Sequence, residues 1–143
     1  MLDATLARVA AAMAQAGARD PWWIIGSAAV VLHGVDTAVA DVDLLLSPAD
    51  AARVLAVWPG GVGLGTASER FRSYPYARLD GAPLPVEIMA GLEVFVDGMW
   101  QAIRPVTREG RRGVFVPGRA ELVDILRMFG REKDLRRAAA LVD

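Results

Sequence analysis

Residues 25–46, with the sequence IGSAAVVLHGVDTAVADVDLLL, place two aspartates inside an apolar run. Asp41 and Asp43 flank one valine and are followed by three leucines. Because residues i and i+2 of a strand face the same side, a strand over 41–46 would present both carboxylates together and Val42, Leu44 and Leu46 on the opposite face. Two such carboxylates repel each other, and burial without a counter-charge would force one to take up a proton. We therefore predict a divalent cation between them.

Mg²⁺ fits this pair because it prefers oxygen ligands and uses only a few protein carboxylates beside waters and substrate phosphates. Mn²⁺ is the alternative ion. Glu87, in the apolar segment PVEIM at 85–89, is the candidate third ligand, since a lone carboxylate there would otherwise be costly. The alternative is that the aspartates end a strand in solvent and that Glu87 is an exposed hairpin residue.

Gly26 and Ser27 precede the acids, where the apolar segment PWWII at 21–25 gives way to a short helical pattern. Backbone N–H groups at such a turn, together with the Ser27 hydroxyl, can hold phosphate oxygens. Glycine allows the ligand to approach the backbone closely. A plain turn with a helix cap is the alternative, and the acid pair downstream favours the phosphate site.

The rest of the chain predicts an α/β (α+β) fold, a small mixed sheet flanked by helices that pack mainly on one side. Amphipathic spacing predicts a helix at the N-terminus, and Ser47 with Pro48 predicts the start of a helix that ends near Val57. Asp80-Gly81 predicts a hairpin turn. The glycine-rich segment 60–65 fits a loop or strand edge better than a dinucleotide loop. We expect one domain over residues 1–143. Further strands are predicted at 21–25, 92–96 and 113–117, and further helices at 28–34, 119–129 and 132–142.

These motifs resemble the nucleotidyltransferase superfamily that includes DNA polymerase beta, and within it the small bacterial minimal nucleotidyltransferases. The family signature is an apolar residue and Gly-Ser or Gly-Gly, then an acid–apolar–acid triplet, then a third acid on a later strand. Here it reads IIGS, thirteen residues, DVDLLL, and later VEIM. The tail, VPGRAELVDILRMFGREKDLRRAAAL, also resembles bacterial members. The resemblance covers residues 22–142.

The resemblance implies transfer of a nucleoside monophosphate from ATP or another NTP to an acceptor hydroxyl. Asp41, Asp43 and Glu87 would hold two metal ions, with Glu87 as the base. Gly26 and Ser27 would bind the β- and γ-phosphates. Acceptors of relatives include RNA, proteins and small molecules, and some relatives belong to toxin–antitoxin pairs, so we expect a homodimer or such a partner as alternatives.

Two cationic positions are further candidates for substrate phosphates. Arg72, on the predicted hairpin strand with Arg78, could face Glu87, and Lys133 in GREKDL could reach a triphosphate. Exposed surface charges are the alternative for each. The only histidine, His33, is expected to pack, and the tryptophans are expected in the core, with Trp100 as a candidate for stacking a base.

The sequence departs from the family pattern in two ways. No arginine precedes the acid pair, although Thr37 is present, and the third acid is glutamate where aspartate is commoner. These departures keep open a catalytically inactive binding or antitoxin module, and the carboxylates alone leave a metal-dependent phosphate-ester hydrolase as a further alternative.

Composition places the expected enzyme in the cytoplasm. The chain has no cysteine, a mean hydropathy of +0.31, and a longest apolar run too short for the roughly 20 residues of a membrane span. Residues 104–143 carry ten basic and six acidic side chains, whereas residues 1–103 carry six and eleven. The basic tail could face a polyanion or be a solvated helix surface.

Overall fold

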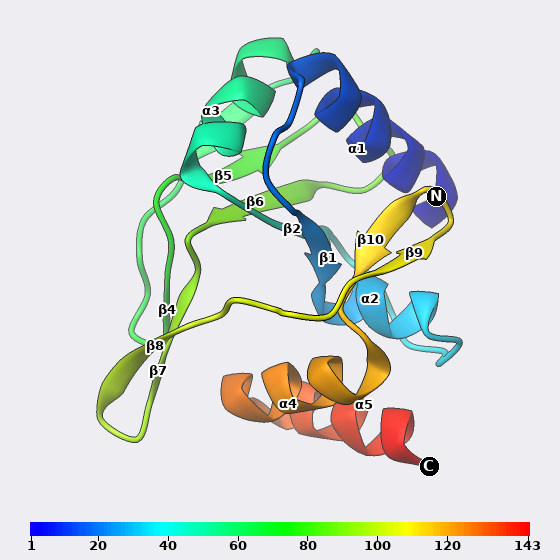
Figure 1. Cartoon of the computed structure of the whole chain (residues 1–143), viewed down its shortest axis with the longest axis vertical. Coiled ribbons are helices and arrows are strands. Elements are labelled where there is room, and N and C mark those ends of the chain that lie inside the picture. Colours follow the sequence, from blue (N-terminus) through cyan, green and yellow to red (C-terminus); the bar gives the residue numbers. More distant parts are fainter.

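A five-stranded mixed sheet forms the centre of the computed structural model, which describes all 143 residues (Figure 1). Its strand order is β1-β2-β6-β5-β3. β2 and β6 run parallel, and every other neighbouring pair is antiparallel. The predicted mixed sheet is confirmed. The strands of this sheet are β1 (Trp23–Ile25), β2 (Val42–Leu46), β3 (Val62–Leu64), β5 (Tyr76–Leu79) and β6 (Val86–Ala90).

Two smaller sheets complete the β-structure. A three-stranded sheet has the order β4-β7-β8, and β9 pairs with β10 as a hairpin. The strands are β4 (Phe71–Arg72), β7 (Glu93–Val96), β8 (Met99–Ala102), β9 (Glu109–Arg111) and β10 (Val114–Val116). β8 and β9 were not predicted, because both are short and largely exposed and therefore lack an apolar alternation. β3 is the exposed edge strand foreseen for the glycine-rich segment.

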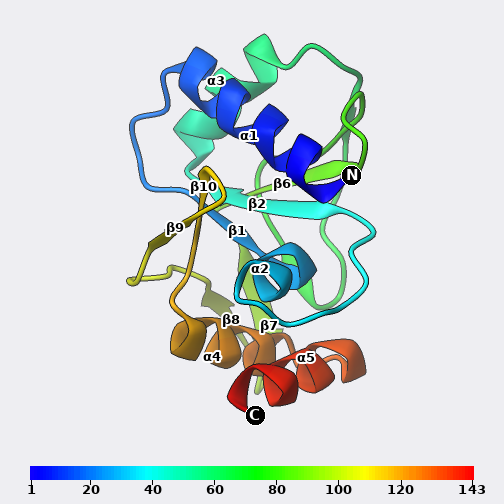
Figure 2. The same ribbon diagram turned by 90° about the vertical axis from the view of Figure 1, so that its right-hand side faces the viewer.

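Helices cover both faces of the central sheet, which corrects the expectation that they pack mainly on one side. α1 and α3 pack together above the sheet, whereas α2, α4 and α5 lie below it (Figure 2). None of the helices combines the length and apolarity that a membrane crossing needs. The helices are α1 (Leu2–Ala16), α2 (Gly26–Leu32), α3 (Pro48–Val57), α4 (Arg119–Phe129) and α5 (Glu132–Val142).

The start of α3 is fixed by the residues that the sequence analysis singled out. The Ser47 hydroxyl accepts a hydrogen bond from the Asp50 amide, and Pro48 takes the first helical position. The fully buried Asp50 carboxylate accepts the amides of Arg19 and Asp20 and pairs with Arg53 at 2.7 Å. It thereby ties the segment between α1 and β1 to α3.

The two C-terminal helices meet at a sharp turn. Gly130 adopts a left-handed conformation (φ 70°) that ends α4, as the sequence predicted. Asp134, which is 1% exposed, accepts two hydrogen bonds from the Arg131 guanidinium and one from the Arg131 amide. This arrangement caps the first turn of α5.

Replacing Asp50 with asparagine should lower stability by about 3 kcal/mol at neutral pH, since backbone donors and Arg53 would lose a buried carboxylate. Burial alone would raise the Asp50 pKa, but the hydrogen bonds from Arg19, Asp20 and Arg53 lower it overall. A lowered pKa stabilises the fold above the unfolded value of about 4, and this contribution is lost as pH falls through the folded value. Urea unfolding between pH 3 and pH 7 measures the difference.

The exposed Asp124, on α4, offers a matched control, because Asp124→Asn removes the same charge without a buried partner. A stability loss in Asp50→Asn that is no larger than in the control, or that does not shrink below pH 4, would contradict the argument.

Candidate metal and nucleotide site

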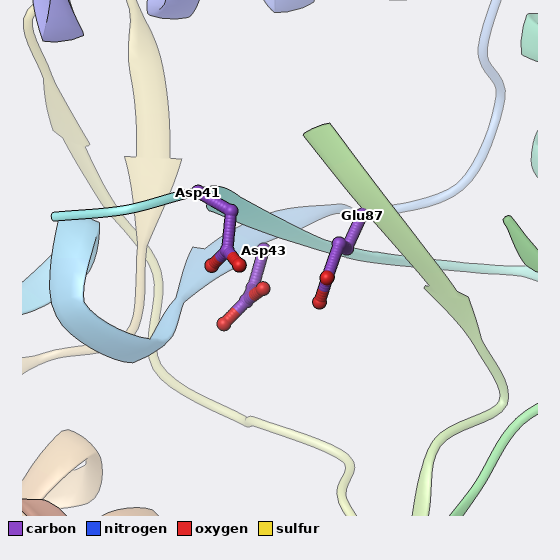
Figure 3. A group of neighbouring side chains, drawn as sticks. All are labelled: Asp41, Asp43 and Glu87. Atoms are coloured by element: carbon purple, nitrogen blue, oxygen red, sulfur yellow. The ribbon is translucent and has the colours of Figure 1, made fainter. Parts of the chain in front are cut away.

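Three carboxylates converge on the lower face of the central sheet (Figure 3). Parallel pairing of β2 with β6 sets Asp43 opposite Glu87, and Asp41 directly precedes β2. One oxygen from each carboxylate lies within 4.8 Å of those of the other two. The sequence-predicted acids are therefore brought together from two strands that lie more than forty residues apart along the chain.

Ionisation of the Asp43 carboxyl is disfavoured by its surroundings. Burial, reinforced by the charges of Asp41 and Glu87, raises the pKa of Asp43 well above its ordinary value. Its Oδ1 atom is buried and has no hydrogen-bond partner. An unsatisfied buried carboxylate oxygen beside two further carboxylates is the donor set that a hard divalent cation such as Mg²⁺ binds, so the residues present fit the predicted ion.

Gly26 brings the chain directly against this carboxylate. Its φ of +69° is a conformation that other residues rarely adopt, and a Cβ atom there would overlap Asp43 Oδ2. Glycine is thus required for two reasons, backbone conformation and close approach. Ser27 follows it, largely buried, in the first turn of α2.

A pocket of about 530 Å³ opens over the three acids. It is lined by segments of the sheet, by the loop between α2 and β2, and by the α4–α5 turn. All the residues predicted for the site lie in its lining: Gly26, Ser27, Asp41, Asp43, Arg72, Glu87 and Lys133.

Arg72 lies on β4 of the three-stranded sheet, which corrects its expected position on the hairpin strand beside Glu87. It pairs with Glu93 at 2.7 Å and lies over the Trp100 ring. The hairpin neighbour of Glu87 is Arg78, which faces it across β5 and β6 with a 3.4 Å contact. Both pairs are partly exposed, so each adds little to stability.

Tyr76, Arg131 and Arg137 are among the pocket residues that sequence reasoning missed. Tyr76 lines the same pocket as the acids, and burial, together with the nearby charges of Glu87, Asp43 and Asp41, raises the pKa of Tyr76 to about 12. Arg137 lies four residues after Lys133, so helical spacing was a usable signal that both share one face of α5. No local pattern marked Tyr76, because only the β5–β6 pairing brings it to the site.

The remaining candidates lie outside the pocket. His33 is buried, and its Nε2 lies 2.8 Å from the Pro117 carbonyl oxygen, which fits the predicted packing role. Trp22 and Trp58 are buried, Trp23 is half-buried against the core, and the Trp58 ring donates to the Asp80 carbonyl. Trp100 lies on β8 against Phe95 and against the pocket residue Arg72, but it does not itself line the pocket.

No protein-family model matches the sequence, and a search of curated proteins likewise finds no match.

Solved structures do match the fold. TM1012 from Thermotoga maritima, described as a candidate nucleotidyltransferase, has a TM-score of 0.61 at 19% identity and aligns over 87% of this chain and 81% of its own. The solution structure of the antibiotic-resistance factor ANT(2″)-Ia has a TM-score of 0.63 at 12% identity, over 97% and 81%. Its crystal structure with adenylyl-2″-tobramycin has a TM-score of 0.54 at 15% identity, over 95% and 94%.

These likenesses show the fold of the chain. The chain has the nucleotidyltransferase fold, as its motifs predicted, with the same mixed arrangement of helices and sheets as these neighbours.

Asp43→Asn should stabilise the protein by about 2 kcal/mol in EDTA at pH 7.5, because it removes a carboxyl whose ionisation is opposed by burial and by Asp41 and Glu87. With 10 mM Mg²⁺ the wild type should gain stability and the variant should not. Urea unfolding with and without the ion measures both effects. An equal response of the two proteins to Mg²⁺ would show that the ion binds elsewhere.

Proposed function

We propose that this protein, acting as one domain over residues 1–143, is a Mg²⁺-dependent nucleotidyltransferase that moves a nucleoside monophosphate from an NTP to an acceptor hydroxyl. The observation that carries the proposal is the convergence of Asp41, Asp43 and Glu87 with an unpartnered buried oxygen on Asp43. The fold supports it, because the matched structures are those of nucleotidyltransferases.

Each acid takes a role that follows from its position. Asp41 and Asp43 would hold the ions, Mg²⁺ or alternatively Mn²⁺, at a two-metal site completed by Glu87. When bound, such ions neutralise the triphosphate and stabilise the charge that develops during in-line displacement. Glu87, on the neighbouring strand, would accept the proton of the attacking hydroxyl.

The bond changes balance without a further reactant. The acceptor oxygen forms a bond to the α-phosphorus, the bond from the α-phosphorus to the bridging oxygen breaks, and pyrophosphate leaves with that oxygen. The hydroxyl proton passes to Glu87.

The triphosphate would lie between the acids and α5. Gly26 and Ser27 are proposed to bind the β- and γ-phosphates through backbone and hydroxyl groups at the start of α2. Lys133 lines the same pocket and forms no ion pair, so its charge is free to meet a phosphate. Arg72, although paired with Glu93, is a second proposed phosphate contact.

The proposed acceptor belongs to one of three classes: RNA, a protein or a small molecule. ANT(2″)-Ia, crystallised with adenylyl-2″-tobramycin, is a neighbour with a nucleotide-modified small molecule. A homodimer or a toxin–antitoxin partner would complete the surface around the pocket.

Calorimetric titration of each of the four NTPs should show binding that requires Mg²⁺ and that the variant Asp41→Asn/Asp43→Asn loses. The double variant Asp97→Asn/Asp124→Asn is the control, because it removes two exposed carboxylates outside the pocket. α-Labelled NTP with purified RNA, protein or small-molecule acceptors then tests transfer, and pyrophosphate release separates transfer from hydrolysis to free phosphate.

Failure of every NTP to bind the wild type would overturn the proposed transferase. It would instead favour the alternative of a catalytically inactive module that binds a partner protein.

Lys133→Met should weaken NTP binding about tenfold, because one charge contact to phosphate is worth about 1.4 kcal/mol. Arg127→Met is the matched control, since Arg127 is exposed on α4, forms no ion pair and lies outside the pocket. The same calorimetric titration gives both dissociation constants, and equal affinities for the two variants would remove Lys133 from the site.

A further inference from the structure

The strand order divides the pocket into two halves with the acids between them. One row of paired residues crosses the sheet from Ile25 to Asp43, then to Glu87 and to Arg78. Gly26 follows Ile25 at one end of this row, and Tyr76 lies on β5 at the other end. A ligand on the Gly26 side and a ligand on the Tyr76 side would therefore meet at the acids.

The half beside Gly26 has the character of an anion site. Lys133 and Arg137 reach it from α5, and neither forms an ion pair. Arg137 is held against the loop before β2 by contacts to the Thr37 hydroxyl and the Ala38 carbonyl, at 3.3 and 3.5 Å. The proposed function places the triphosphate against this half, with Arg72 as the one proposed phosphate contact that reaches it from the other half.

The half beside Tyr76 has a different character. Rings and apolar side chains line it together with the hydroxyl groups of Thr66, Ser68 and Ser73 and the phenol of Tyr76. The apolar surfaces come from Phe71, Tyr76, Met89 and Leu92.

Both arginines in this half already pair with carboxylates that lie outside the pocket lining, so each leaves part of its guanidinium group facing the pocket. Arg72 pairs with Glu93 and lies 4.2 Å from the centre of the Trp100 ring. Arg131 pairs with the buried Asp134 and lies 4.9 Å from the centre of the Phe71 ring. Glu87 is the only carboxylate that this half contributes to the pocket lining, and the proposed metal site already uses it.

We propose that the Tyr76 half is the acceptor subsite and that it takes a ring-bearing hydroxyl compound without positive charge. The inference rests on the proposed function, which assigns the other half to the NTP. Apolar and aromatic walls favour burial of a ring, whereas hydroxyl groups and guanidinium edges orient polar substituents or a phosphate.

The same lining disfavours a polycation. An acceptor with several ammonium groups would lose its hydration in a half that supplies no carboxylate beyond Glu87, and it would face two guanidinium groups. The subsite should therefore not bind tobramycin, the aminoglycoside found adenylylated in the ANT(2″)-Ia crystal structure.

The experiment first loads the protein with Mg²⁺ and α,β-methylene-ATP, which cannot release pyrophosphate. Adenosine, AMP and tobramycin are then titrated calorimetrically into the loaded protein. Adenosine, a neutral ring compound with hydroxyl groups, and its anionic counterpart AMP should both bind, and tobramycin should not. Because the NTP half is already filled, this binding reports the second half.

Two added carboxylates in this half should reverse the preference for AMP over tobramycin. The variant Thr66→Glu/Ser73→Glu should weaken AMP binding at least tenfold and should strengthen tobramycin binding by a similar factor. The control Val106→Glu/Val142→Glu adds the same net charge at exposed positions outside the pocket and should behave as the wild type.

Tighter binding of tobramycin than of AMP to the loaded wild type would overturn the proposal, as would the absence of binding by both adenosine and AMP. An unchanged preference in Thr66→Glu/Ser73→Glu would also overturn it. If the ATP analogue itself does not load, the proposed transferase function fails first and the acceptor subsite falls with it.

Discussion

Repulsion among three carboxylates is the constraint on which the organisation of this protein depends. Parallel pairing of β2 with β6 fixes Asp43 opposite Glu87, and the period of a strand adds Asp41 on the same face. Apolar neighbours on the other face of each strand anchor this register in the core, since Val42, Leu44 and Ile88 are almost fully buried. A shift of one residue would bury the acids and expose the core, so the packing that stabilises the sheet also enforces the unfavourable cluster.

Stability and chemistry make opposite demands at this cluster. The unpartnered Asp43 oxygen and the raised Asp43 pKa show that the fold makes ionisation of this carboxyl costly, because burial and the neighbouring acids oppose it. Asp50 and Asp134, the two fully buried aspartates, are both satisfied by amides and an arginine three residues away. The contrast separates carboxylates that hold the structure together from those that are available for a ligand.

The C-terminal helices give the pocket its cationic wall. The excess of basic residues after residue 103 had two interpretations, a polyanion-binding face and a solvated surface. In the structure, some of these side chains line the pocket and others lie on the exposed surface. Arg131, Lys133 and Arg137 line the pocket, whereas Arg111, Arg112 and Arg136 form exposed ion pairs elsewhere. Net charge was therefore a poor guide to function, because the position of each charge on its helix decides what it can meet.

The sequence by itself determined the helices at both ends, the strands that carry the acids, and the triad, because strand alternation, helix caps and turn glycines are local signals. The resemblance of its motifs to those of a known family further predicted the nucleotidyltransferase fold. The structural neighbours confirm this fold. Only the tertiary structure decided that helices cover both faces, that Arg72 belongs to a second sheet, and that Tyr76 lines the pocket over the acids. These features depend on contacts between residues far apart in the chain, and no periodicity within one segment encodes which distant segment will lie beside it.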